Sequence, residues 1–173
     1  MFLNQVSLKN YNSFGIDVKA EFFVSVKSLE DLVSVLKTNP SKMLVLGGGN
    51  NVLLTKDVKG LVVHINLKGI KICEKNKATT VVKAFAGENW HDFVSWTLNH
   101  NLGGLENLAL IPGNVGTAPI QNIGAYGVEL KDSLVNCEAL NLKTLEIETF
   151  SNADCKFGYR NSVFKSKCKG QYI

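Results

Sequence analysis

Leu110–Gly127, which reads LIPGNVGTAPIQNIGAYG, is the stretch of sequence that decides the fold. Its four glycines stand among two prolines, three amide side chains and apolar residues, with neither helical nor strand periodicity. Glycines in such a segment allow positive φ angles and let main-chain N–H groups approach a ligand closely, as a phosphate cradle requires. An ordered irregular segment of this length is usually functional, and a purely structural loop is the alternative.

An earlier segment, Leu44–Leu54, repeats this pattern as LVLGGGNNVLL. Here an apolar run that favours a strand is followed by a glycine triplet and by Asn50 and Asn51, which tolerate left-handed conformations. A ligand-free tight turn is the alternative. No G-K-[ST] follows for a P-loop, and G-x-G-x-x-G is not completed before a helix, so neither of these nucleotide-binding motifs is present. Two such loops predict one elongated ligand that carries phosphate.

Composition favours a soluble globular protein of one or two domains, since 45% of the 173 residues are hydrophobic and 20% are charged. The net charge of +4 is spread along the chain, so we expect no nucleic-acid partner.

The start lacks the features of a signal peptide, and no run of about 18 apolar residues occurs, so we expect a cytoplasmic protein without a membrane partner. The four cysteines are too widely spaced for a zinc site, and we expect free thiols and no bound metal.

The order of expected elements predicts two subdomains, residues 1–67 and 68–173. The first would contain strands at 22–26, 43–46 and 61–65 and a helix capped by Ser28 that ends at Lys37. The second would contain hairpins at 70–86 and 134–150, a helix at 89–99 with Trp90, Phe93, Val94, Thr97 and Leu98 on one face, and a helical turn from Ser151. Gln171–Ile173 has the pattern of a strand that is only beginning, so we expect the chain to be a fragment.

Both glycine segments, together with Asn12–Ile16 (NSFGI), Ala86–Trp90 (AGENW) and Phe157–Arg160 (FGYR), resemble the UDP-N-acetylenolpyruvoylglucosamine reductase family. The resemblance runs from Asn12 to Lys165, and five motifs in the family's order make it specific. It implies an α+β protein with the FAD-binding fold of the vanillyl-alcohol-oxidase/PCMH type, made of two α/β subdomains. The family's C-terminal substrate domain would be missing from this chain.

The resemblance also implies noncovalently bound FAD, NADPH as hydride donor and a UDP-sugar enolpyruvate substrate, in a cytoplasmic enzyme of peptidoglycan synthesis that we expect to be a monomer. Arg160 and Tyr159 would be catalytic, with Arg160 stabilising negative charge beside the substrate carboxylate. Without the resemblance, the same pair would be a surface cation and a core aromatic. The family's serine proton donor and late glutamate would lie beyond Ile173.

The residues expected to contact FAD come from both glycine segments. Thr117 can offer a hydroxyl to a phosphate, Ile111 and Ile120 can pack against a flat ring, and Asn122 can hydrogen-bond a heterocycle or brace the loop. The full set is Gly47, Gly48, Gly49, Asn50, Asn51, Val52, Ile111, Pro112, Gly113, Val115, Gly116, Thr117, Ile120, Asn122, Gly124 and Tyr126. We expect valine at Gly49 or Gly116 to weaken FAD binding more than it weakens the fold.

Two other functions are compatible with the sequence. Another flavin oxidase of the same fold would lack the Tyr159–Arg160 context and often attaches FAD through a histidine or cysteine, which neither glycine loop contains. A non-catalytic nucleotide-binding module is the other possibility, because a substrate domain would be absent.

Overall fold

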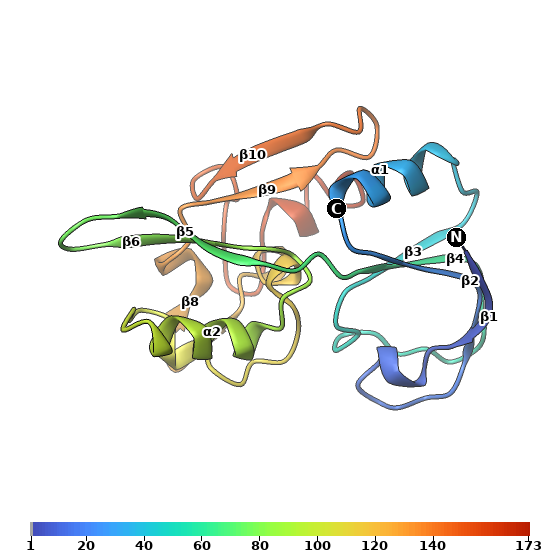
Figure 1. The fold of residues 1–173 in the computed structure, drawn as a ribbon, viewed down its shortest axis with the longest axis horizontal. Helices are drawn as coiled ribbons and strands as arrows, with labels where there is room; N and C mark the ends of the chain where they lie inside the picture. The colour runs from blue at the N-terminus through green and yellow to red at the C-terminus, as the bar shows by residue number, and fades with distance from the viewer. Residues whose placement is uncertain (1) are drawn as a thin grey trace. The chain divides into compact units, whose positions relative to one another are not determined.

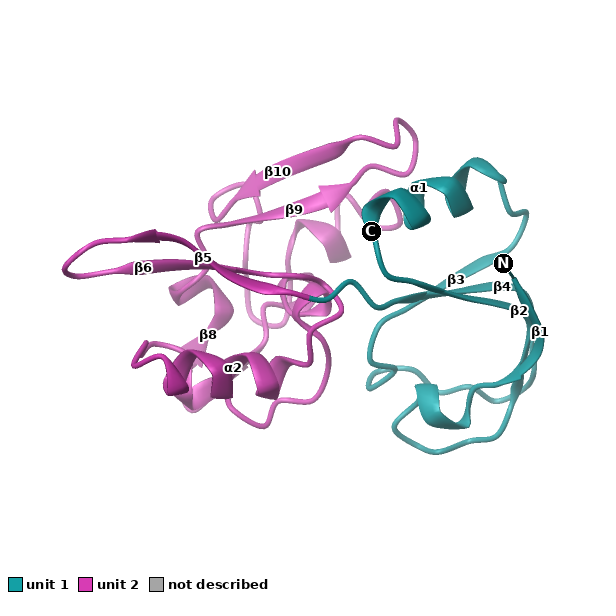
Figure 2. Ribbon diagram, in the orientation of Figure 1, with its two compact units in different colours: residues 1–68 teal, residues 69–173 magenta. Residues whose placement is uncertain are grey.

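The protein divides into two compact units, which we describe from a computed structural model of residues 2–173. Unit 1 ends at Lys68 and unit 2 runs from Gly69 to Ile173. Figure 2 colours unit 1 teal and unit 2 magenta. Each unit has its own sheets and its own helix.

Unit 1 is a four-stranded sheet with the strand order β1-β2-β4-β3. Strands β2, β4 and β3 are parallel, and β1 is antiparallel to β2 at one edge. The elements are β1 (Leu3–Ser7), a 3-10 helix η1 (Lys9–Tyr11), β2 (Lys19–Val26), α1 (Leu29–Lys37), β3 (Met43–Leu46) and β4 (Val58–Ile65). Strand β1 was not expected from the sequence, because three of its five residues are polar.

Local capping and burial explain the arrangement of unit 1. The Ser28 hydroxyl accepts the Asp31 N–H at 3.0 Å, which fixes the start of α1 as predicted. The helix buries Leu32 and Val35, and Figure 1 shows it on one side of the sheet with η1 on the other. A core on the η1 side joins the strands to the segment that follows β3; it contains Leu8, Val18, Ala20, Phe23, Leu46, Leu54 and Val62.

Unit 2 contains one α-helix, three two-stranded antiparallel sheets and several 3-10 turns. The strands are β5 (Ile70–Lys75), β6 (Thr80–Ala84), β7 (Gly124–Ala125), β8 (Val128–Glu129), β9 (Asn136–Leu140) and β10 (Ile147–Ser151). The helices are α2 (Trp90–Asn99), η2 (Glu106–Leu108), η3 (Val115–Thr117), η4 (Pro119–Gln121), η5 (Leu130–Asp132) and η6 (Val163–Lys165). The two hairpins and the helix predicted for this part of the chain are therefore confirmed.

The core of unit 2 surrounds Trp90, which is 2% exposed and whose indole N–H donates to the Leu108 carbonyl at 2.7 Å. Ala118 and Ile123 of the long glycine segment belong to this core, with Phe93, Val94, Leu108 and Leu130. Apolar packing of Ala118 and Ile123 therefore holds the segment against the core of unit 2. Of the five residues predicted on one face of α2, four are buried and Leu98 is 46% exposed.

The end of the chain contains the predicted helical turn. Ser151 and Asp154 exchange the hydrogen bonds of a cap, and the Cys155 N–H donates to the Ser151 carbonyl at 3.1 Å, which closes a single turn after β10. Gln171–Ile173 pairs with the edge of β9, since Leu140 and Ile173 each donate an N–H to the other's carbonyl, at 2.7 and 3.0 Å. The terminal residues therefore have a strand partner, which the sequence did not reveal.

Candidate functional site

The first glycine loop, Gly47–Asn51, begins directly after β3 and lies against the Asn12–Ile16 motif. The Ser13 N–H donates to the Gly49 carbonyl at 3.2 Å, and the Asn50 side-chain amide donates to the Ser13 hydroxyl at 2.6 Å. Two motifs that are far apart in the sequence therefore form one pair of loops within unit 1.

Buried Asn12 gives the partner loop its shape. Its side-chain amide donates to the carbonyls of Leu8 and Ile16 at 2.7 and 3.0 Å, and its oxygen accepts the Ile16 N–H at 3.0 Å. Asn12 is 8% exposed. The loop that supports the glycine triplet is thus fixed by one satisfied polar side chain.

Glycine is required at position 49 because the main chain of Tyr11 approaches it closely. Gly49 is buried at φ +65°, and a Cβ there would collide with the main-chain carbonyl of Tyr11. The close approach that requires glycine is therefore made by Tyr11, so valine here would damage the fold as well as binding. That valine at Gly49 weakens FAD binding more than the fold stays a prediction.

The main-chain N–H groups of the first glycine loop remain available. Within residues 2–173, the N–H groups of Gly48, Gly49, Asn50 and Asn51 donate to no acceptor in the protein. Consecutive N–H donors of this kind suit an anionic oxygen. The side chain of Val52, the next predicted contact residue, packs against the core of unit 1.

The second glycine loop, Pro112–Gly127, runs beside the Ala86–Trp90 motif. The Trp90 N–H donates to the Gly113 carbonyl at 3.0 Å, and the Val115 N–H donates to the Glu88 carbonyl at 2.9 Å. A Cβ on Gly116 would come within 2.6 Å of the Ala86 Cβ. As with Gly49, the absence of a side chain makes room for another segment of the protein, so valine at Gly116 would strain the fold. That it weakens FAD binding more than the fold stays a prediction.

Hydrogen bonds inside the protein occupy the main chain of this loop. The N–H groups of four successive residues, Val115 to Ala118, donate to the carbonyls of Glu88, Ala86, Asn114 and Val115. The Thr117 hydroxyl, predicted to face a phosphate, donates to the Asn114 carbonyl at 2.8 Å. These N–H groups are therefore not the anion donors that the glycine pattern predicted.

The side chains predicted to contact FAD in this loop divide into buried and exposed residues. Asn122 is fully buried, donates to the Gly158 carbonyl and accepts the Lys131 N–H, both at 3.1 Å. Of its two predicted roles, the structure therefore supports bracing of the loop. Ile111 packs against the Trp90 core, whereas Ile120 is 40% exposed.

Tyr126 and Gly127 form the tip of the β7–β8 hairpin. Both have positive φ, +52° and +79°, as a two-residue type I′ turn requires. A tyrosine rarely adopts this conformation, and its side chain is 88% exposed. Residues held in such sparsely populated backbone conformations cluster at functional sites.

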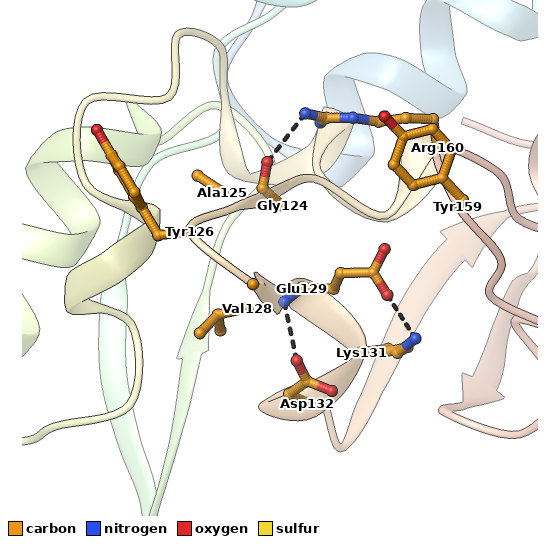
Figure 3. A pocket seen from close by; sticks show the side chains of 10 residues that line it. Gly124, Ala125, Tyr126, Val128, Glu129, Lys131, Asp132, Tyr159 and Arg160 are labelled. Atoms are coloured by element: carbon orange, nitrogen blue, oxygen red, sulfur yellow. Dashed lines mark hydrogen bonds and ion pairs between the residues drawn. The ribbon is translucent and has the colours of Figure 1, made fainter.

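The Tyr159–Arg160 motif lies beside this hairpin. The Arg160 Nη2 donates to the Gly124 carbonyl at 2.9 Å, as Figure 3 shows. Tyr159 is 87% exposed. An open hollow of about 490 Å³ is lined by Gly124, Ala125, Tyr126, Gly127, Val128, Glu129, Lys131, Asp132, Tyr159 and Arg160. The structure therefore brings together Arg160, Tyr159, Gly124 and Tyr126 at one hollow, and their roles there stay predictions.

One wall of the hollow carries an ion pair. Glu129 pairs with Lys131, and this hydrogen bond and charge raise the pKa of the Lys131 ammonium. The Asp132 carboxylate accepts the Glu129 N–H at 2.8 Å and caps a short 3-10 turn. The hollow thus contains both cationic and anionic groups, of which Arg160 is the one that keeps its charge at any accessible pH.

A sequence model described as FAD binding domain matches residues 20–149, which is most of the chain. The chain belongs to this FAD-binding family. It is 56% identical over 168 residues to the UDP-N-acetylenolpyruvoylglucosamine reductase of Flavobacterium johnsoniae, a match that covers 96% of this chain and 50% of that protein. The chain thus spans about half the length of this curated relative.

Solved structures agree with the family. The UDP-N-acetylenolpyruvylglucosamine reductase of Thermus caldophilus superimposes with a TM-score of 0.72 at 27% identity, covering 91% of this chain and 55% of that one. A VAO-type flavoprotein of Myceliophthora thermophila superimposes with a TM-score of 0.57 at 15% identity, covering 78% and 27%. The predicted fold of the vanillyl-alcohol-oxidase type is confirmed.

Sequence reasoning did not identify Ser162, Glu129 or Lys131. Ser162 is 1% exposed and donates to the Ile120 carbonyl at 2.7 Å. Its position two residues after Arg160 was the available signal.

Among residues 2–173, no group of three metal-ligating side chains occurs, and none of the helices could span a membrane.

Proposed function

We propose that this chain provides the FAD-binding part of a reductase that converts UDP-N-acetylglucosamine enolpyruvate to UDP-N-acetylmuramate with NADPH, in peptidoglycan precursor synthesis. The observation that carries the proposal is the 56% identity to a UDP-N-acetylenolpyruvoylglucosamine reductase over 96% of the chain. A match of that extent includes both glycine loops and the Tyr159–Arg160 motif.

The free N–H groups of the first glycine loop fit the pyrophosphate of FAD. Four successive donors, Gly48 to Asn51, face no acceptor within residues 2–173. The second glycine loop would contribute a rigid apolar and aromatic surface, including Ile120 and Tyr126. Neither loop contains histidine or cysteine, so we infer that FAD is held noncovalently. On this proposal, residues 1–67 and 68–173 are the two FAD-binding subdomains.

FAD, when bound, supplies the capacity to accept and donate a hydride. The chain's own contribution to the chemistry is the Arg160 guanidinium, which gives one N–H to Gly124 and keeps further donors for the substrate. These donors would stabilise negative charge that develops beside the enolpyruvyl carboxylate. Tyr159, exposed at the same hollow, would contact the sugar nucleotide. We expect the whole protein to act as a cytoplasmic monomer.

The test uses the complete gene product, reconstituted with FAD and then precipitated with acid. We expect the flavin to appear in the supernatant, and yellow colour retained in the pellet would contradict noncovalent binding.

A second measurement follows NADPH absorbance with and without the enolpyruvyl sugar nucleotide. Oxidation that depends on this substrate supports the reductase. A folded, flavin-loaded protein with no such dependence would instead be a non-catalytic FAD module.

A further inference from the structure

Tyr159 and Arg160 occupy the two corners of a tight turn. Gly158 and Asn161 each donate an N–H to the other's carbonyl, at 3.0 and 3.1 Å, and this closes the turn around the pair. Arg160 has a φ of +50°, which is uncommon for a residue with a side chain. A strained conformation persists only where the surroundings hold it.

Two buried polar side chains flank this turn, and both connect it to the second glycine loop. On one side, fully buried Asn122 donates to the Gly158 carbonyl at 3.1 Å. On the other, Ser162, which is 1% exposed, donates to the Ile120 carbonyl at 2.7 Å. The turn is therefore anchored at Gly158, directly before the two exposed residues, and at Ser162, two residues after Arg160.

The guanidinium itself depends on these anchors. Arg160 lies at the surface, and its Nη2 bond to the Gly124 carbonyl ends on the same glycine loop. A long exposed side chain has considerable rotamer freedom, so its position follows mainly from where its backbone is held. Asn122 also accepts the Lys131 N–H, and so it ties the opposite wall of the hollow to the turn.

We propose that Asn122 and Ser162 are positioning residues, which fix the Tyr159–Arg160 turn against the second glycine loop so that Arg160 meets the substrate in one orientation. This inference rests on the proposed function. It reassigns Asn122 from a cofactor contact to a support of the catalytic arginine. A merely structural role would lower stability or FAD affinity without a specific effect on the substrate.

The first test compares Ser162→Ala with Thr97→Val in the complete gene product loaded with FAD. Thr97 is a matched control, because it is buried and donates to the Val94 carbonyl at 2.7 Å inside α2. We expect Ser162→Ala to slow flavin oxidation by the enolpyruvyl substrate about 10- to 100-fold, as small misplacements of catalytic groups do. Flavin reduction by NADPH should change less than about twofold, and Thr97→Val should change neither step. Ser162→Thr, which keeps the hydroxyl, should restore most of the rate.

The second test places Ser162→Ala in an Arg160→Ala background. If Ser162 acts through Arg160, the additional substitution slows the substrate step no further. Full additivity of the two effects, or equal slowing of both half-reactions, would overturn the positioning role while leaving the reductase activity of the wild type established. A wild type that oxidises no NADPH in response to substrate would refute the proposed function instead.

The third test needs no cofactor. Asn122→Asp keeps the acceptor for the Lys131 N–H and replaces the donor to Gly158 with an oxygen. We expect faster amide exchange at Gly158 and Asn161 at neutral pH, and recovery of protection at acid pH, where the protonated carboxyl can donate again. Thr97→Val should leave both amides unchanged. Unaltered exchange of these amides in both Ser162→Ala and Asn122→Asp would show that neither side chain holds the turn.

Discussion

In the first glycine loop, the N–H groups of Gly48–Asn51 have no acceptor within residues 2–173, whereas those of Val115–Ala118 in the second loop all donate inside the protein. Both loops contain a glycine pressed against neighbouring backbone or a neighbouring side chain, Gly49 against Tyr11 and Gly116 against Ala86. Similar compositions thus give different surfaces. The first loop presents main-chain donors without an acceptor in residues 2–173, and the second loop is hydrogen-bonded to the Arg160 turn.

The largest expected effect is that of Gly49→Ala on the first loop. The positive φ costs about 1–3 kcal/mol, and the collision with the Tyr11 carbonyl adds about 1–3 kcal/mol of overpacking. Gly15→Ala is the matched control, because Gly15 has nearly the same φ, +63°, and no atom within 4 Å of the added Cβ. Urea unfolding should show a larger loss of stability at Gly49 than at Gly15. Equal losses would mean that the contact with Tyr11 relaxes without cost.

Arg160→Ala tests the second loop as a support for chemistry. We expect FAD binding and flavin reduction by NADPH to be nearly unchanged, while oxidation of the flavin by substrate slows about 10²–10³-fold. Arg160→Lys should recover little, because lysine lacks the planar fork. Stopped-flow absorbance separates the two half-reactions. A defect confined to the NADPH step would remove Arg160 from its assigned role.

Gly116→Ala is expected to cost about 1–3 kcal/mol through overpacking alone. The added methyl would lie 2.6 Å from the Ala86 Cβ. Ala86→Gly removes that atom, so the double variant should be less destabilised than the sum of the single variants. Additive losses in urea unfolding would show that the two segments do not pack as described.

The smallest expected effect is a pH dependence of stability that arises in unit 2 and has no counterpart from a cysteine in unit 1. Unit 1 has no cysteine in residues 2–68, whereas in unit 2 burial raises the pKa of the Cys137 thiol to about 12. The unfolded chain loses this proton near its ordinary pKa of 9.0, so stability is complete below that pH and falls as the pH rises towards 12. The slope is at most about 1.4 kcal/mol per pH unit.

Cys137→Ala should flatten the stability profile above pH 9, and Cys73→Ala, at an exposed thiol, serves as control. Urea unfolding at pH 8 to 10.5 measures both variants. Parallel profiles for Cys137→Ala and the wild type would show that this thiol does not contribute.

Much of the secondary structure followed from local signals. Met43–Leu46 forms the predicted strand, and Ser28 caps the predicted helix, because strand-forming residues and a capping hydroxyl act within a few residues. Strand β1 was missed because its polar sequence is stabilised by pairing with β2, a long-range contact. Leu98 is exposed although it shares the predicted face of α2, because helical periodicity identifies a face but not its limits.

The sequence by itself was enough to identify the family, the two glycine loops and the Tyr159–Arg160 motif, since these depend on residue types in a fixed order. Only the tertiary structure decided that Asn122 and Ser162 anchor the Arg160 turn and that the loops use their N–H groups differently. The physical reason is that a residue type, such as glycine or asparagine, sets which backbone conformations and hydrogen bonds are possible at its position. Which ligand or protein group takes part in those hydrogen bonds depends on segments that are distant in the sequence.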